Sequence, residues 1–124
     1  MEHTNKRMQE AYKLTDEVSL ATRLWVQGDC MDSPSSPLRM RDGQQMILHE
    51  VEMFRPYRDI EKVRGKVCVI QYSHWGYRYF IAKEIVGVDP LSERLKLRYY
   101  NPQRTDLSLN VRKIERVCVV DNVI

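Results

Sequence analysis

The sequence lacks any long apolar segment. None of its hydrophobic runs approaches the roughly 20 residues that a membrane helix needs. The amino terminus, from Met1 to Arg7, leads into no hydrophobic signal core. We therefore expect a cytoplasmic location and no membrane partner.

Cysteine is also scarce, and its spacing is unlike that of a structural site. The three cysteines, at positions 30, 68 and 118, form no Cys-x-x-Cys pair and have no histidine at ligand spacing. This pattern argues against a disulfide scaffold and against structural zinc. We expect no metal and no cofactor.

Positive charge is in small excess. The net charge of +3 is too low to indicate nucleic-acid binding by itself. Residues 94–116 hold seven basic residues against Asp106 and Glu115, which we interpret as the solvated face of a sheet rather than a phosphate-binding stripe. With 43% hydrophobic and 30% charged residues, the 124-residue chain has the composition of one ordinary globular domain.

What the sequence does contain is a series of strand-like runs. Runs rich in Val, Ile, Leu and Tyr, separated by turn residues, occupy positions 22–26, 45–51, 66–72, 79–86, 94–100, 107–111 and 116–120. The loops predicted at 73–77 and 87–93 are short, which favours an antiparallel meander. Polar residues 1–20 predict an arm or a short helix, and residues 59–63 predict a helical turn. The domain itself is expected to span residues 21–124.

One turn carries a candidate nucleophile. Gly28, Asp29, Cys30 and Met31 follow an apolar run, and a cysteine thiol, with a pKa of about 8.5, can pass its proton to a lysine amine. In the strand predicted at 79–86, period two places Lys83 on one face between two isoleucines, where desolvation favours a neutral amine. Backbone N–H groups of the turn would stabilise an oxyanion. These are the parts of an acyl-transfer site.

Each of these residues also has an ordinary structural interpretation. Cys30 suits a tight turn, and Lys83 suits a strand edge from which its amine reaches solvent. Cys68 and Cys118, each between valines, are predicted to be core thiols. The aromatic residues around the 73–77 loop predict either a hairpin cluster or a patch for a partner: Tyr72, Trp75, Tyr77 and Tyr79.

The order of these motifs resembles the carboxy-terminal domain of LexA and the phage repressors, a family of self-cleaving serine–lysine peptidases. Residues 26–31 match the strand and nucleophile turn of that family, and residues 41–44 look like its second Gly-Asp element. Further matches follow in order along the chain: a strand at 65–70, the lysine strand at 81–85, a leucine-rich strand ending in Asn-Pro at 95–102, and a last strand at 114–120.

The resemblance implies a mainly β fold: a curled, partly barrel-like antiparallel sheet with one or two short helices. It also implies Cys30 as nucleophile, Lys83 as base, and Gly28, Asp29 and Met31 as the turn around the oxyanion. Cys30 stands where the family has serine, and residues 1–20 contain neither the Ala-Gly nor the Cys-Gly pair that the family cuts. They are also too few for the helix-turn-helix that such repressors use to bind operators.

We therefore expect a stand-alone regulatory domain of phage or mobile-element repressor type. It would act in transcriptional regulation as a homodimer, or as a heterodimer with a related repressor, without binding nucleic acid directly. Two alternatives stay open: an active Cys/Lys (auto)peptidase of the same family, and an unrelated small β domain that binds a protein through Trp75 and its tyrosine neighbours.

Overall fold

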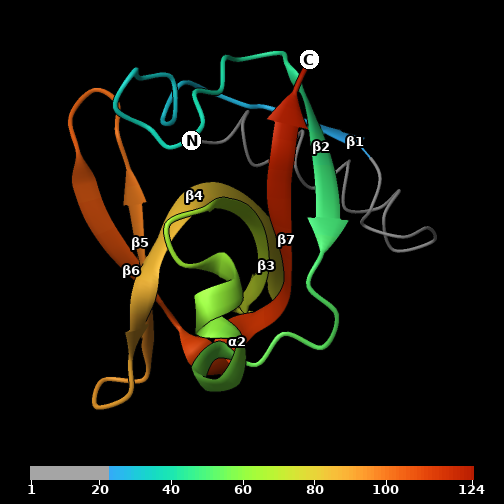
Figure 1. Ribbon diagram of the computed structural model, residues 1–124. Helices are drawn as coiled ribbons and strands as arrows, with labels where there is room; N and C mark the ends of the chain where they lie inside the picture. The colour runs from blue at the N-terminus through green and yellow to red at the C-terminus, as the bar shows by residue number, and fades with distance from the viewer. Residues whose placement is uncertain (1–22) are drawn as a thin grey trace.

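The computed structural model describes residues 23–124, so the arm predicted at 1–20 lies outside the described residues. The described chain is mainly β, with its strands in one antiparallel sheet of order β1-β2-β7-β3-β4-β5-β6. The sheet is curled but not closed into a barrel (Figure 1). The strands are β1 (Arg23–Trp25), β2 (Gln45–Glu50), β3 (Val67–His74), β4 (Tyr77–Asp89), β5 (Arg94–Tyr99), β6 (Thr105–Asn110) and β7 (Ile114–Val123).

The predicted mainly β, antiparallel fold is confirmed. Strands β3 to β6 are neighbours in chain order, as a meander requires, whereas β7 inserts between β2 and β3. Two predicted loops are shorter than expected. Only Trp75 and Gly76 lie between β3 and β4, and both have positive φ. A two-residue turn with positive φ at both positions matches the right-handed twist of the strands that it joins. β4 also continues through Gly87, where its register with β5 shifts.

The sheet is buried on both faces. Along β3, Val67 and Val69 pack into one apolar core, and Cys68 and Ile70 pack into another, since successive side chains point to opposite faces. This explains why β3 has a continuous apolar sequence rather than an alternating one. The predicted core positions of Cys68 and Cys118 are confirmed, because both thiols are buried.

Helix α2 (Pro56–Val63) covers the second core, with Ile60 and Val63 buried against the sheet (Figure 1). It contains the predicted turn at 59–63 and begins three residues earlier, at Pro56, where a proline needs no hydrogen-bond acceptor for its nitrogen. A second, shorter helix, η1 (Val111–Lys113), leads into β7.

A buried carboxylate organises the start of α2. Asp59 accepts hydrogen bonds from the Arg55 N–H (2.9 Å) and from Arg58 Nε and Nη2 (3.0 and 2.9 Å), and Lys62 Nζ lies 3.3 Å away. The bonds from Arg58 and Arg55 hold the pKa of Asp59 well below its usual range. The ionised carboxylate therefore stabilises the folded state.

We expect Asp59→Asn to remove a pH-dependent part of this stability. The folded-state pKa lies below the unfolded value of about 3.9, so the contribution is complete above the unfolded pKa and is lost as the pH falls through the folded one. Urea unfolding should therefore give a larger difference in the free energy of unfolding between wild type and variant at about pH 6.5 than at about pH 3.

The control is Glu52→Gln, which changes an exposed carboxylate with no partner among residues 23–124. The free energy of unfolding of this variant should stay close to that of wild type at both pH values. An Asp59→Asn difference that is equal at the two pH values would contradict the stabilising role of the ionised carboxylate.

Candidate functional site

The turn formed by Gly28, Asp29, Cys30 and Met31, called here the 28–31 turn, begins the long loop between β1 and β2. Two hydrogen bonds connect the two ends of this loop. The Gly28 N–H donates to Asp42 Oδ1 (2.8 Å), and the Gly43 N–H donates to the Val26 carbonyl (3.0 Å). Gly28 and Gly43 both have positive φ, which a side chain would disfavour. The two Gly- and Asp-containing motifs of the sequence therefore lie side by side.

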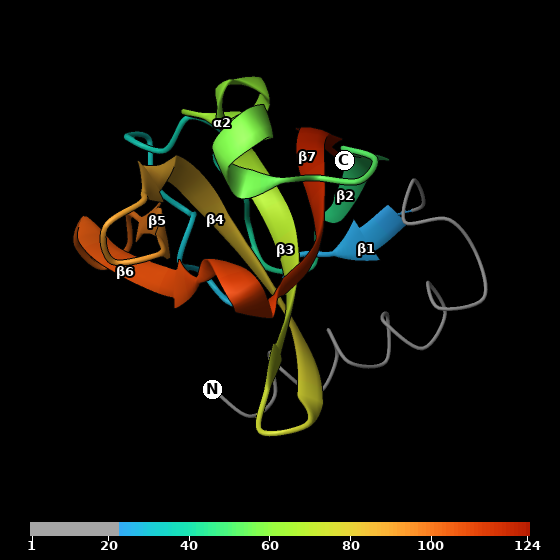
Figure 2. The ribbon, with the colours of Figure 1, turned by 90° about the horizontal axis from the view of Figure 1, so that it is seen from below.

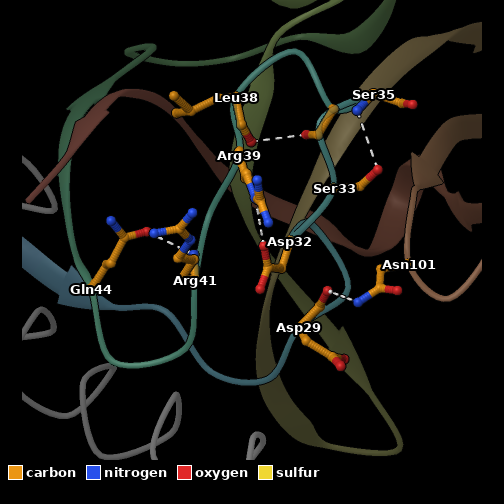
Figure 3. Close-up of polar contacts among 10 residues, drawn as sticks. Asp29, Asp32, Ser33, Ser35, Leu38, Arg39, Arg41, Gln44 and Asn101 are labelled. Carbon is orange, nitrogen blue, oxygen red and sulfur yellow. Dashed lines mark hydrogen bonds and ion pairs between the residues drawn. The ribbon is translucent and has the colours of Figure 1, made fainter.

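Two methionines fix the loop onto the sheet. Met31 and Met40 are both buried in the first core, and the Met40 N–H donates to the Met31 carbonyl (3.0 Å). Between them, Arg39 Nε and Asp32 Oδ1 form an ion pair at 2.7 Å (Figure 3). The 28–31 turn is thus positioned by core packing although it lies outside any regular element.

The same turn contacts the chain just after β5. The Cys30 carbonyl accepts hydrogen bonds from the N–H groups of Tyr100 and Asn101, both at 2.9 Å. The Asn101 side-chain amide donates to the Asp29 carbonyl (3.0 Å; Figure 3). The loop therefore joins the β1 side of the curled sheet to the β5 and β6 side (Figure 1).

Lys83 reaches the same region from β4. It pairs with Cys68 of β3 and shares the face of Ile81 and Ile85, as the period-two pattern predicts. Its Nζ atom lies 5.3 Å from the centroid of the Tyr99 ring, within the range of a cation–π interaction. The 28–31 turn and the Lys83 amine therefore border one segment, residues 99–101.

The Cys30–Lys83 dyad stays a prediction. Within residues 23–124, no hydrogen bond joins Cys30 Sγ to Lys83 Nζ, and the amine lies on the Tyr99 ring instead. The N–H groups of Cys30 and Met31 have no hydrogen-bond acceptor in the described part of the chain. The site therefore combines a partly exposed cysteine with an amine that borders the same 99–101 segment, without a hydrogen bond between them.

Sequence reasoning missed the residues that join these parts, Tyr99, Tyr100 and Asn101. The Tyr100 hydroxyl donates to the buried Glu84 carboxylate, and burial together with this bond raises the pKa of Tyr100. Asn101 was noted only as part of an Asn-Pro motif. Alternation in β5 places Tyr99 on the face of its leucines, but no local signal shows that the end of β5 meets residue 30.

The other reactive side chains lie away from this site or are protected. Burial raises the pKa of the Cys68 thiol and that of the Cys118 thiol to about 12 each. His49 Nδ1 forms an exposed pair with Asp121 (2.8 Å) on neighbouring strands. In the part of the chain that the structure describes, no three His, Cys, Asp or Glu side chains converge as metal ligands.

Comparison with known proteins identifies no relative: no protein-family model, curated protein or solved structure matches the chain. Over residues 23–124, no helix has the length and apolar character required to cross a membrane.

We expect Cys30 to be the reactive thiol of the folded protein. At about pH 8, thiols whose pKa is about 12 carry on the order of 10³ less thiolate than an ordinary cysteine, and burial slows them further. Iodoacetamide followed by peptide mass spectrometry should modify Cys30 at least ~100-fold faster than Cys68 or Cys118.

Cys30→Ser should abolish the fast modification, and unfolding in urea should make the remaining thiols reactive. Equal rates at two or three of the native thiols would show that the buried cysteines are not protected as the packing requires.

Proposed function

We propose that this chain is a LexA-like regulatory domain of phage or mobile-element repressor type, acting by association with itself or with a related repressor. The observation that carries the proposal is the position of the 28–31 turn, held by Tyr100 and Asn101 next to the strand of Lys83. A nucleophile turn beside a lysine strand is what the motif order of that family implies. The single antiparallel sheet is consistent with it.

The state of the dyad favours association over proteolysis. A lysine base must lie within hydrogen-bond reach of its nucleophile, although this contact is often loose without substrate. Here Lys83 interacts with Tyr99, and Cys30 Sγ forms no hydrogen bond with it among the described residues. The proposal therefore assigns this chain an association role without an engaged catalytic pair.

Two exposed apolar side chains on either side of β2 supply a surface for association. Trp25 of the edge strand β1 pairs with Gln45 of β2, and Ile124 exchanges backbone hydrogen bonds with the same residue. The two apolar side chains are 39% and 56% exposed. Because exposed large apolar residues commonly mark interfaces, we assign the self-association surface to Trp25 and Ile124, on either side of Gln45.

We expect the purified chain to sediment as a dimer. The double variant Trp25→Glu with Ile124→Glu should raise the Kd of this dimer at least ~10-fold. Like charges brought together across a two-fold interface repel, and the apolar contact is lost. The control is Leu91→Glu, an exposed residue in the β4–β5 turn, which should leave the Kd within about twofold.

The same proteins test the link to transcription. Adding wild-type chain to a related LexA-type repressor should weaken operator binding by at least ~10-fold, because each mixed dimer replaces one of the repressor's own subunits. The double variant should have no such effect. A wild-type chain that is monomeric at all concentrations, and that leaves operator affinity unchanged, would contradict the proposal.

A second candidate is the Cys/Lys peptidase, favoured by the partly exposed Cys30 and by its N–H group, which has no acceptor among residues 23–124. Under the association proposal, we expect no cleavage of the chain at about pH 10, and we expect Lys83→Ala to change the alkylation rate of Cys30 by less than about twofold. Cleavage that disappears in Cys30→Ala, or alkylation at neutral pH that slows ~10-fold in Lys83→Ala, would favour the peptidase instead.

A further inference from the structure

The β3–β4 hairpin extends away from the rest of the sheet, on the side opposite α2 (Figure 2). Its turn carries two exposed aromatic side chains: Trp75 is 83% exposed and Tyr77 is 66% exposed. Trp75 has a φ of +52°, a left-handed conformation that large side chains disfavour and that asparagine or glycine adopts more readily. The folded state therefore gains little from this tryptophan, either by burial or by turn geometry.

Further rings continue from the turn along one side of the hairpin. Tyr72 pairs across the strands with Tyr79, and their rings stack at 5.5 Å. His74 pairs with Tyr77 two positions on, and the His74 ring meets the Trp75 ring edge-on at 5.9 Å. Since cross-strand partners share a face, these five rings form one surface, called here the aromatic face.

A basic hollow of about 430 Å³ lies beside the aromatic face. Its lining includes Tyr72 and His74 from β3, Arg94 from β5, Ser108 and Asn110 from β6, and Lys113 from η1, and no carboxylate from residues 23–124. Arg94 donates to Ser108 Oγ and to the Ser108 carbonyl, both at 3.0 Å, rather than to an acid.

Neither cation of the hollow forms an ion pair within the described residues. Lys113 forms no ion pair there, whereas nearby basic groups do: Arg112 pairs with Glu93 (3.3 Å) and Arg78 with Glu115 (3.5 Å). Two cations and a histidine beside exposed rings favour a ligand that carries negative charge next to apolar or planar groups.

The backbone beside the hollow favours a peptide over a nucleic acid. β6 is an edge strand of the sheet that residues 23–124 form, and three of its residues, Ser108, Leu109 and Asn110, line the hollow. An edge strand can pair with an added strand, which an extended peptide supplies and a nucleic acid does not. A single-stranded nucleic acid would also require a row of cations that follows its phosphates, and the hollow has only two such side chains.

We propose that the aromatic face and the basic hollow bind an extended acidic segment of a partner protein. Arg94 and Lys113 meet its carboxylates, and the Trp75 and Tyr77 rings cover its apolar side chains. This surface is formed by residues of β3, β4, β5, β6 and η1, apart from Trp25, Ile124 and Cys30, so the proposal does not rest on the proposed function.

The test uses a fluorescein-labelled random copolymer of glutamate and tyrosine, with fluorescence anisotropy as the readout. We expect the chain to bind it, Trp75→Asn to weaken binding ~10-fold, and Lys113→Glu to weaken it roughly fivefold. Trp75→Asn creates an Asn-Gly turn, so this variant should fold at least as stably as wild type, and loss of binding will not reflect unfolding.

Two matched controls accompany these variants. Tyr57→Asn removes an exposed aromatic residue of α2, and Lys66→Glu makes the same charge change on an exposed lysine away from the hollow. Both should bind the copolymer within about twofold of wild type. A copolymer of lysine and tyrosine should not bind.

Three results would overturn the proposal. The first is copolymer binding that Trp75→Asn and Lys113→Glu leave unchanged relative to their controls. The second is tighter binding of oligothymidylate than of the acidic copolymer, sensitive to the same two substitutions, which would assign the surface to single-stranded nucleic acid. The third is concentration-dependent self-association that Trp75→Asn abolishes, which would assign it to a second copy of this chain.

Discussion

The Cys30 carbonyl accepts two backbone hydrogen bonds from the segment that follows β5, and the arrangement of the candidate site depends on this contact. It joins a loop that begins after β1 to the other side of a curled, open sheet. Burial of Met31 and Met40 contributes roughly 1.5–3 kcal/mol for each side chain, against about 0.5–1.5 kcal/mol for each hydrogen bond. The methionines therefore hold the loop on the sheet, and the hydrogen bonds select which residue faces β5.

Strand β4 supplies the other residues of the site, Lys83 and Glu84, which point to opposite faces of the sheet. Because β3 and β4 are packed on both faces, the lysine at position 83 shares a face with isoleucines, and its amine extends to the Tyr99 ring. The Glu84 carboxylate, on the opposite face, accepts from the Tyr100 hydroxyl. Successive residues of one strand thus hold successive residues of the 99–101 segment, the same segment that binds the 28–31 turn.

The sequence predicted what local periodicity controls. The strand positions and the buried Cys68 and Cys118 follow from short runs rich in apolar residues, and the common face of Ile81, Lys83 and Ile85 follows from the period of two in a strand. The contact between residue 30 and residues 100–101 could not be predicted, because it depends on how far the sheet curls. The hairpin loop predicted at 73–77 is present, but its reduction to two residues could not be predicted, since a tryptophan gives no signal for a left-handed conformation.

The most direct test of this arrangement is the rate of amide hydrogen exchange at Tyr100 and Asn101, measured by NMR on the folded chain. If the Cys30 carbonyl accepts from both groups, both amides should exchange at least ~100-fold more slowly than unprotected amides of the same sequence, although they lie outside β5. Exchange of both amides at the unprotected rate would contradict it, because the 28–31 turn would then not be held beside Lys83.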